Sequence, residues 1–158
     1  MNSLFYSICF LFLLVMGDMQ AQPDEVIRTK EQNNKWLWDL EMLPLKAQAE
    51  KIQKRILTDT SDYKQDAFAI TGQAPSGKRP LYIMDNIVIG ICKETSTASL
   101  KELSAMINNT ISIKILEEAQ GTPVYGIKAT GGVILLETTN KKTEDKLKQL
   151  KLTGTGCN

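Results

Sequence analysis

Residues 111–139 read ISIKILEEAQGTPVYGIKATGGVILLETT, and the predicted order of strands rests on them. The stretch opens with isoleucine at alternate positions, a period of two that is typical of a half-buried strand. It closes with residues 132–138, an apolar run that suits a strand covered on both faces. The polar connection between the two runs contains glycine and proline, so we expect a short crossover rather than a tight hairpin.

Another strand is predicted upstream, in residues 79–86, RPLYIMDN, which end in a turn at Asp85 and Asn86. Residues 87–91 extend the strand pattern beyond that turn. Ser99 and Glu102 then have the form of a capping box, which predicts a short helix that begins there.

A last short helix is predicted after Thr143, with acidic residues in its first turn and lysines near its end. Together these segments predict an α+β fold: a small mixed sheet of about four strands with two or three helices. The chain then divides into four parts, which are residues 1–21, 22–78, 79–142 and 143–158.

The order of segments in residues 79–142 resembles the plug domain of TonB-dependent outer-membrane receptors of Bacteroidetes-like bacteria. The matching positions are Pro80–Asp85, Ile111–Leu116, Tyr125–Gly126, Ala129, Gly132–Ile134 and Thr138. The run YGIKATGGVILLETTNK is the most specific part. The chain departs from the family pattern at three motif positions, which are Asn86 for glycine, Lys128 for arginine and Gly131 for asparagine.

The resemblance implies a cell-envelope system in which plug domains gate nutrient receptors and contact the inner-membrane energy transducer. A transporter of this kind needs many membrane strands of about ten residues each. We therefore expect no transport by this chain itself, because only residues 143–158 follow the plug-like segment. Within the motif, Tyr125, Gly126, Gly131 and Gly132 are expected to be structural, since glycine adopts backbone angles that other residues avoid.

Residues 1–21 contain a short apolar run and end in Ala21, as expected of a signal peptide. The alternative is an uncleaved anchor or a buried helix. A signal peptide predicts a location in the periplasm or at the outer-membrane periphery. Of the three cysteines, Cys9 would be removed with it, leaving Cys92 and Cys157 either to form a disulfide or to stay as one buried and one loose thiol.

Residues 22–78 are expected to form an irregular lead-in, a helical region and a loop. Helical periodicity begins at Lys35, and Pro44 predicts either a kink or the start of a second helix. Trp36 and Trp38 lie on the first helical segment and are candidates for contact with a partner protein or with a membrane surface. The alternative is that this helix packs its apolar face on its own domain.

Several kinds of chemistry are excluded or disfavoured by the residues present. The chain has no histidine, the commonest general base and metal ligand, and its net charge of +1 gives no attraction to nucleic acid. Residues 72–79 resemble a phosphate-binding loop but lack the hydroxyl that binds magnesium, so we expect no nucleotide, metal or cofactor. Asp85 is interpreted as a turn residue that hydrogen-bonds its own backbone.

These observations predict that the protein is not an enzyme. The leading hypothesis is a non-catalytic, secreted cell-envelope protein whose plug-like module binds another envelope protein or a nutrient ligand. The alternative is a stand-alone structural remnant of a receptor, without a receptor partner. A third hypothesis, an enzyme that uses a groove near Asp85, has the weakest support.

Overall fold

The computed structural model describes residues 27, 29–63, 79–91, 95–139 and 142–153, with only the backbone for residues 60–63. The predicted signal peptide, the phosphate-loop-like segment before Arg79, Cys92 and Cys157 therefore lie outside the described residues. Among the helices of the described residues, none is long and apolar enough to cross a membrane.

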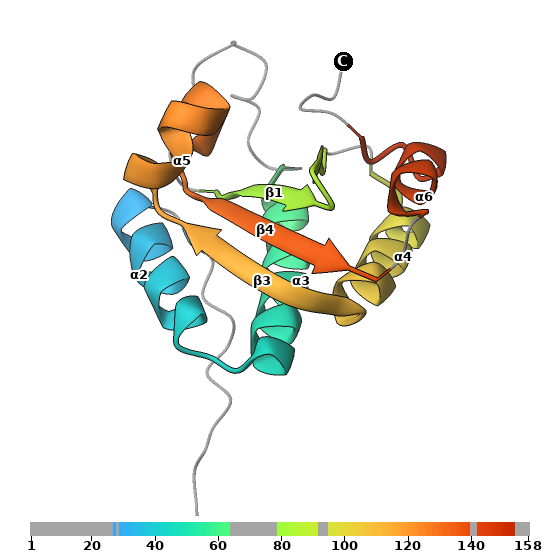
Figure 1. Ribbon diagram of the computed structural model, residues 1–158, viewed down its shortest axis with the longest axis horizontal. Coiled ribbons are helices and arrows are strands. Elements are labelled where there is room, and N and C mark those ends of the chain that lie inside the picture. The colour runs from blue at the N-terminus through green and yellow to red at the C-terminus, as the bar shows by residue number, and fades with distance from the viewer. Residues whose placement is uncertain (1–26, 28, 64–78, 92–94, 140–141, 154–158) are drawn as a thin grey trace, which may run out of the picture.

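A mixed sheet of four strands forms the centre of the described chain (Figure 1). Its strands are β1 (Leu81–Met84), β2 (Ile87–Val88), β3 (Thr110–Leu116) and β4 (Val133–Thr138), arranged in the order β2-β1-β4-β3. Strand β4 runs parallel to β1 and antiparallel to β3, and β1 and β2 form an antiparallel hairpin. The predicted α+β class and four-stranded mixed sheet are confirmed.

The connection between β3 and β4 folds as a helix, α5 (Glu118–Tyr125), followed by the 3-10 helix η2 (Gly126–Ala129). The prediction of a connection longer than a tight hairpin is confirmed. Its description as a crossover is wrong, because β3 and β4 are antiparallel neighbours and the connection stays at one end of the sheet. The apolar character of β4 explains its central place, since Val133, Ile134 and Leu136 are buried there.

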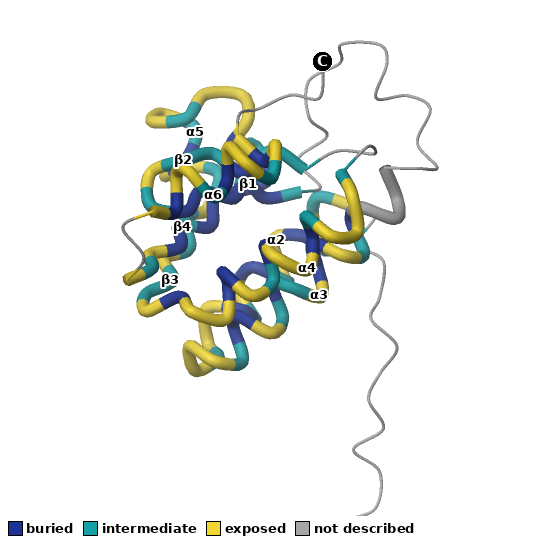
Figure 2. The backbone as a smooth tube through the Cα atoms, turned by 90° about the vertical axis from the view of Figure 1, so that its right-hand side faces the viewer, coloured by how far each residue is buried: buried dark blue, intermediate teal, exposed yellow. Residues whose placement is uncertain are grey.

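Three helices cover one face of the sheet (Figures 1 and 2): α2 (Lys30–Glu41), α3 (Leu45–Tyr63) and α4 (Thr97–Asn108). A fourth, α6 (Thr143–Gln149), follows β4 and lies beside α4 in Figure 1. The main core lies between these helices and the sheet. It combines residues from both layers, among them Leu37, Leu40, Ile52, Ile56, Leu103, Ile107, Met84, Ile134 and Leu136.

Side-chain caps set the starts of α2 and α4, and both starts differ from expectation. Helix α2 begins at Lys30, earlier than the predicted Lys35, because Thr29 and Gln32 form a reciprocal capping box. Helix α4 is capped by Ser96, whose hydroxyl accepts a hydrogen bond from the Ser99 backbone N–H, so Ser99 is inside the helix rather than its cap.

The predicted break at Pro44 takes the form of a second helix. Helix α3 begins at Leu45, and the Pro44 carbonyl accepts a bond from the Gln48 backbone N–H. The Gln48 side chain reaches back to the Leu40 carbonyl near the end of α2, at 3.1 Å. Helices α2 and α3 therefore form a hairpin whose corner is fixed by hydrogen bonds.

Candidate functional site

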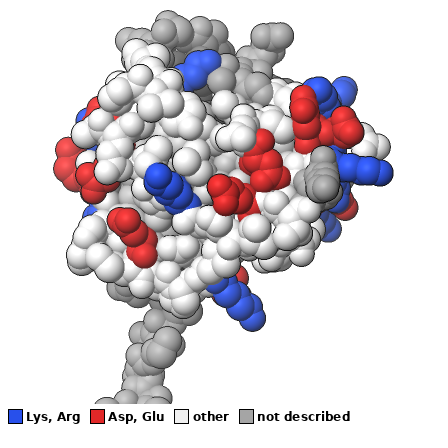
Figure 3. All heavy atoms as spheres, viewed as in Figure 1, with Lys and Arg blue, Asp and Glu red and all other residues white. Residues whose placement is uncertain are grey.

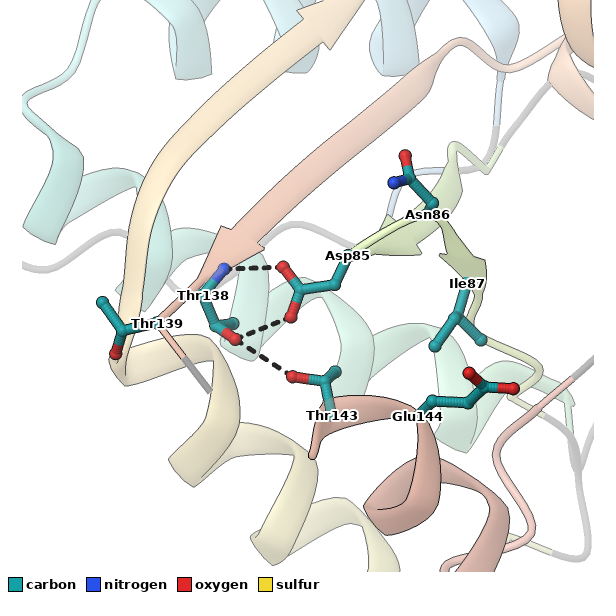
Figure 4. Close-up of a pocket in the computed structure, with 7 residues that line it drawn as sticks. All are labelled: Asp85, Asn86, Ile87, Thr138, Thr139, Thr143 and Glu144. Carbon is teal, nitrogen blue, oxygen red and sulfur yellow. Dashed lines mark hydrogen bonds between the residues drawn. The ribbon is translucent and has the colours of Figure 1, made fainter. Parts of the chain in front are cut away.

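The turn between β1 and β2 places Asp85 at the edge of an open hollow (Figure 4). Asp85 and Asn86 are the two loop residues of the hairpin, and their φ angles are 49° and 68°. Positive φ at both positions is the geometry of a type I′ turn, which suits the twist of a hairpin. Asparagine and aspartate adopt it more readily than most residues, so Asp85 and Asn86 suit this turn.

The Asp85 carboxylate joins three elements of the fold. One oxygen accepts a hydrogen bond from the Thr138 backbone N–H at 2.8 Å, and the other accepts one from the Thr138 hydroxyl at 2.7 Å. The Thr138 hydroxyl lies 3.1 Å from that of Thr143, the first residue of α6 (Figure 4). The prediction of a purely local turn residue is therefore wrong, because the carboxylate ties the turn to the end of β4 and the start of α6.

These contacts keep Asp85 ionised. Partial burial acts to raise the pKa of Asp85, but hydrogen bonds from the Thr143 and Thr138 hydroxyls and from the Thr138 backbone N–H outweigh it and hold that pKa below its usual value. A carboxylate with a lowered pKa whose two oxygens both accept bonds is poorly placed to exchange protons with a substrate. Asp85 therefore supplies a negative charge held in place by its bonds to Thr138.

Two adjoining hollows share Asp85, Asn86 and Thr138. The first continues toward α6 and is lined by hydroxyl and carboxylate groups. The second continues over the sheet and has an apolar floor. Their remaining lining residues are Ile87, Thr139, Thr143 and Glu144 in the first, and Ile83, Ile111, Leu135, Leu136 and Glu137 in the second.

The motif glycines form a point of close backbone approach. A Cβ atom at Gly131 would overlap the backbone carbonyl of Arg79, and one at Gly132, whose φ is 83°, would lie 2.9 Å from the Leu116 carbonyl oxygen. Gly126 also has a positive φ, 67°, but nothing lies within 4 Å of its Cβ position. Tyr125 packs against the small apolar cluster beside Val133.

Trp36 and Trp38 do not form a single site. Trp36 is partly buried against the core. The guanidinium carbon of Arg55 lies over the Trp36 ring, 4.9 Å from the centre of that ring. Trp38 is 57% exposed, and Met42 and Leu45, at 65% and 39%, are also exposed; the three fall within eight residues of the chain around the α2–α3 corner, and are called the apolar corner below. Residues two apart on a helix point in different directions, which explains the contrast.

A buried polar cluster links this hairpin to the plug-like motif. The Asn33 amide donates to the Gly131 carbonyl at 2.8 Å, and the Arg55 guanidinium donates to Asn33 and Asp59 at 3.3 and 2.8 Å. All three residues are at least 94% buried. Sequence analysis missed this cluster. The only signal was the four-residue spacing of Arg55 and Asp59, which is common on exposed helix faces.

No group of three or more histidine, cysteine, aspartate or glutamate side chains in the described part of the chain is arranged to hold a metal ion. Comparison of the chain with protein-family models, curated proteins and solved structures gives no match. The likeness to plug domains therefore rests on the motif residues themselves.

Proposed function

We propose that the mature chain is a non-catalytic, secreted protein of the cell envelope, located in the periplasm or at the outer-membrane periphery, whose plug-like module binds another envelope protein. The motif residues Asp85, Gly131 and Gly132 are engaged in holding strands and turns together. These roles are structural, so exposed side chains are the candidates for binding a partner.

The observation that carries the proposal is the apolar corner of Trp38, Met42 and Leu45. Helix α2 buries Leu37 and Leu40 on one side, whereas Trp38 and the C-cap residue Met42, four positions later, are 57% and 65% exposed. Residues four apart lie on one side of a helix, and neighbouring exposed apolar side chains are candidates for contact with another protein. Tryptophan is also enriched among the residues that dominate binding energy at protein interfaces.

Site-specific photo-cross-linking in intact cells tests this proposal. A photoreactive residue at Met42 should give one discrete cross-linked protein, whereas the same group at exposed Lys101 on α4 should not. Adding Trp38→Ala to the Met42 probe should remove the product. Absence of any discrete product at Met42 would remove this corner as an interface, and absence of a product from every exposed position would support the alternative, a structural remnant with no partner.

A further inference from the structure

The face of the sheet opposite α2, α3 and α4 is only partly covered. Side chains alternate along β4, so Val133, Leu135 and Glu137 point to this face, while Ile134 and Leu136 point to the core. Tyr125 and Ala129, from α5 and η2, pack beside Val133. The other half of the face has no covering element among the described residues, and Figure 3 shows it from outside.

An exposed isoleucine extends the apolar floor of this half. The register of β3 against β4 shifts between Thr110 and Ser112, and Ile111 lies at that irregularity. Its side chain is 57% exposed and lines the hollow together with Ile83 and Leu135. An irregularity of this kind re-aims a side chain, and here it adds an aliphatic group to the surface.

The same hollow and its neighbour carry negative charge. Asp85, Glu137 and Glu144 line the two, and no lysine or arginine does, although Lys114 lies opposite Leu135 on β3, beside the second hollow. Glu137 is exposed and makes no ion pair with any described residue, whereas Glu144 pairs with Lys148 at 2.6 Å. Figure 3 shows acidic groups in the middle of this face.

We infer that this face docks an extended segment of a partner protein in which a lysine or arginine stands two residues from an aliphatic residue. The aliphatic side chain contacts Ile83, Ile111 and Leu135, and the cation approaches Glu137 and the ionised Asp85. Extended chains suit the site because alternate side chains project about 7 Å apart on one face. With that spacing, one side chain contacts the apolar residues of the hollow while the next on the same face reaches the carboxylates. The inference deepens the proposed function by naming the chemistry of the partner.

Defined peptides test the docking site without the partner. One probe is a fluorescent peptide of about ten residues built on the repeat Lys-Ser-Val-Ser, which places lysine and valine by turns on one face of an extended chain; the matched probe has glutamate for lysine. Fluorescence anisotropy with the mature chain should show saturable binding of the lysine peptide alone. Its affinity should fall as sodium chloride rises from about 0.05 to 0.5 M, because salt screens exposed charges.

Charge-reversal variants then locate the binding. Glu137→Lys should weaken binding by about five- to tenfold, and Lys114→Glu, on the strand beside Leu135, should strengthen it. Glu50→Lys, on helix α3 of the covered face, is the matched control for net charge and should leave affinity unchanged. Ile111→Ser should also weaken binding, which separates apolar docking from simple attraction of charge.

Three outcomes would overturn the inference: no saturable binding of the lysine peptide, equal effects of Glu137→Lys and Glu50→Lys, or full competition by butylamine at the peptide's own concentration. The last would identify a small-cation site. These results are distinguishable from failure of the proposed function, because the peptide assay needs no cellular partner. Peptide binding without any cross-linked protein at Met42 would leave this site in place and remove only the apolar corner as an interface.

Discussion

At the scale of single residues, Asp85 does more than its position in a turn predicts. Its carboxylate accepts two hydrogen bonds from Thr138, which is 53 residues away. Such bonds involve an ionised acceptor and are stronger than bonds between neutral groups. The residue therefore joins the β1–β2 turn to the end of β4, and its substitution should affect stability.

Asp85→Gly separates this role from that of the turn. Glycine is favoured at a positive φ of 49°, so the turn itself should tolerate the change. Loss of the carboxylate should nevertheless lower the free energy of unfolding by about 1–3 kcal/mol, because the partly buried Thr138 N–H and hydroxyl lose their acceptor. Urea denaturation measures the change. Stability equal to or above wild type would restore the interpretation of Asp85 as a local turn residue.

The pH dependence of stability has a definite sign at Asp85. A carboxyl whose pKa is lower in the folded than in the unfolded chain stabilises the fold above its unfolded pKa, and the contribution is lost as pH falls through the folded pKa. The difference in stability between wild type and Asp85→Asn should therefore be full at neutral pH and shrink below about pH 4. Denaturation at a series of pH values checks this, and a difference that is independent of pH would contradict it.

Gly132 is constrained by neighbours as well as by its backbone angle. Gly132→Val should lower the free energy of unfolding by about 1–3 kcal/mol, because the new side chain meets the Leu116 carbonyl and Leu37 at a positive φ. Gly126 is the matched control, since its φ is also positive but its surroundings are empty. Thermal unfolding should show a larger cost for valine than for alanine at Gly132 and a small difference between the two at Gly126. An equal size dependence at both glycines would count against crowding.

At the scale of elements, helix α2 divides its aromatic side chains between two tasks. Trp36 packs on the core and on Arg55, whereas Trp38 belongs to the exposed corner with Met42 and Leu45. Of the two tryptophans in this short helix, Trp36 therefore stabilises the fold and Trp38 belongs to an exposed surface.

Single alanine substitutions distinguish these tasks. Trp36→Ala should lower the free energy of unfolding by about 2–4 kcal/mol through lost burial and lost contact with Arg55. Trp38→Ala should change it by less than about 0.5 kcal/mol, as for exposed positions in general, while removing the cross-link at Met42. If Trp38→Ala destabilised the chain as much as Trp36→Ala, loss of cross-linking would report unfolding rather than a lost contact.

At the scale of the whole molecule, the hairpin of α2 and α3 is part of the same folding unit as the plug-like segment. Its residues Leu37, Leu40, Ile52 and Ile56 share one core with the sheet, and Asn33 bonds the Gly131 carbonyl across 98 residues. We therefore expect that the plug-like segment, residues 79–142, does not fold independently of this hairpin.

A truncated chain of residues 79–153 should show no cooperative unfolding transition. Without the hairpin, the core face of the sheet, which includes Met84, Ile134 and Leu136, would be exposed to water. Circular dichroism during urea titration, compared with residues 22–158, tests this. A sharp transition for the shorter chain would show that the plug-like segment is a domain by itself.

Local patterns were enough to locate β1, β3 and β4, the helices after Pro44 and before Asn108, and the α+β class, because side-chain periodicity is a property of neighbouring residues. A capping box at Thr29 and Gln32 was also readable, although it was missed. Four features depended on the tertiary structure. They are the antiparallel pairing of β3 with β4, the bonds between Asp85 and Thr138, the Asn33–Arg55–Asp59 cluster, and the different exposures of Trp36 and Trp38. Each of these joins residues distant in the chain or depends on what covers them, and partners of that kind are chosen by packing and burial, which local propensity does not encode.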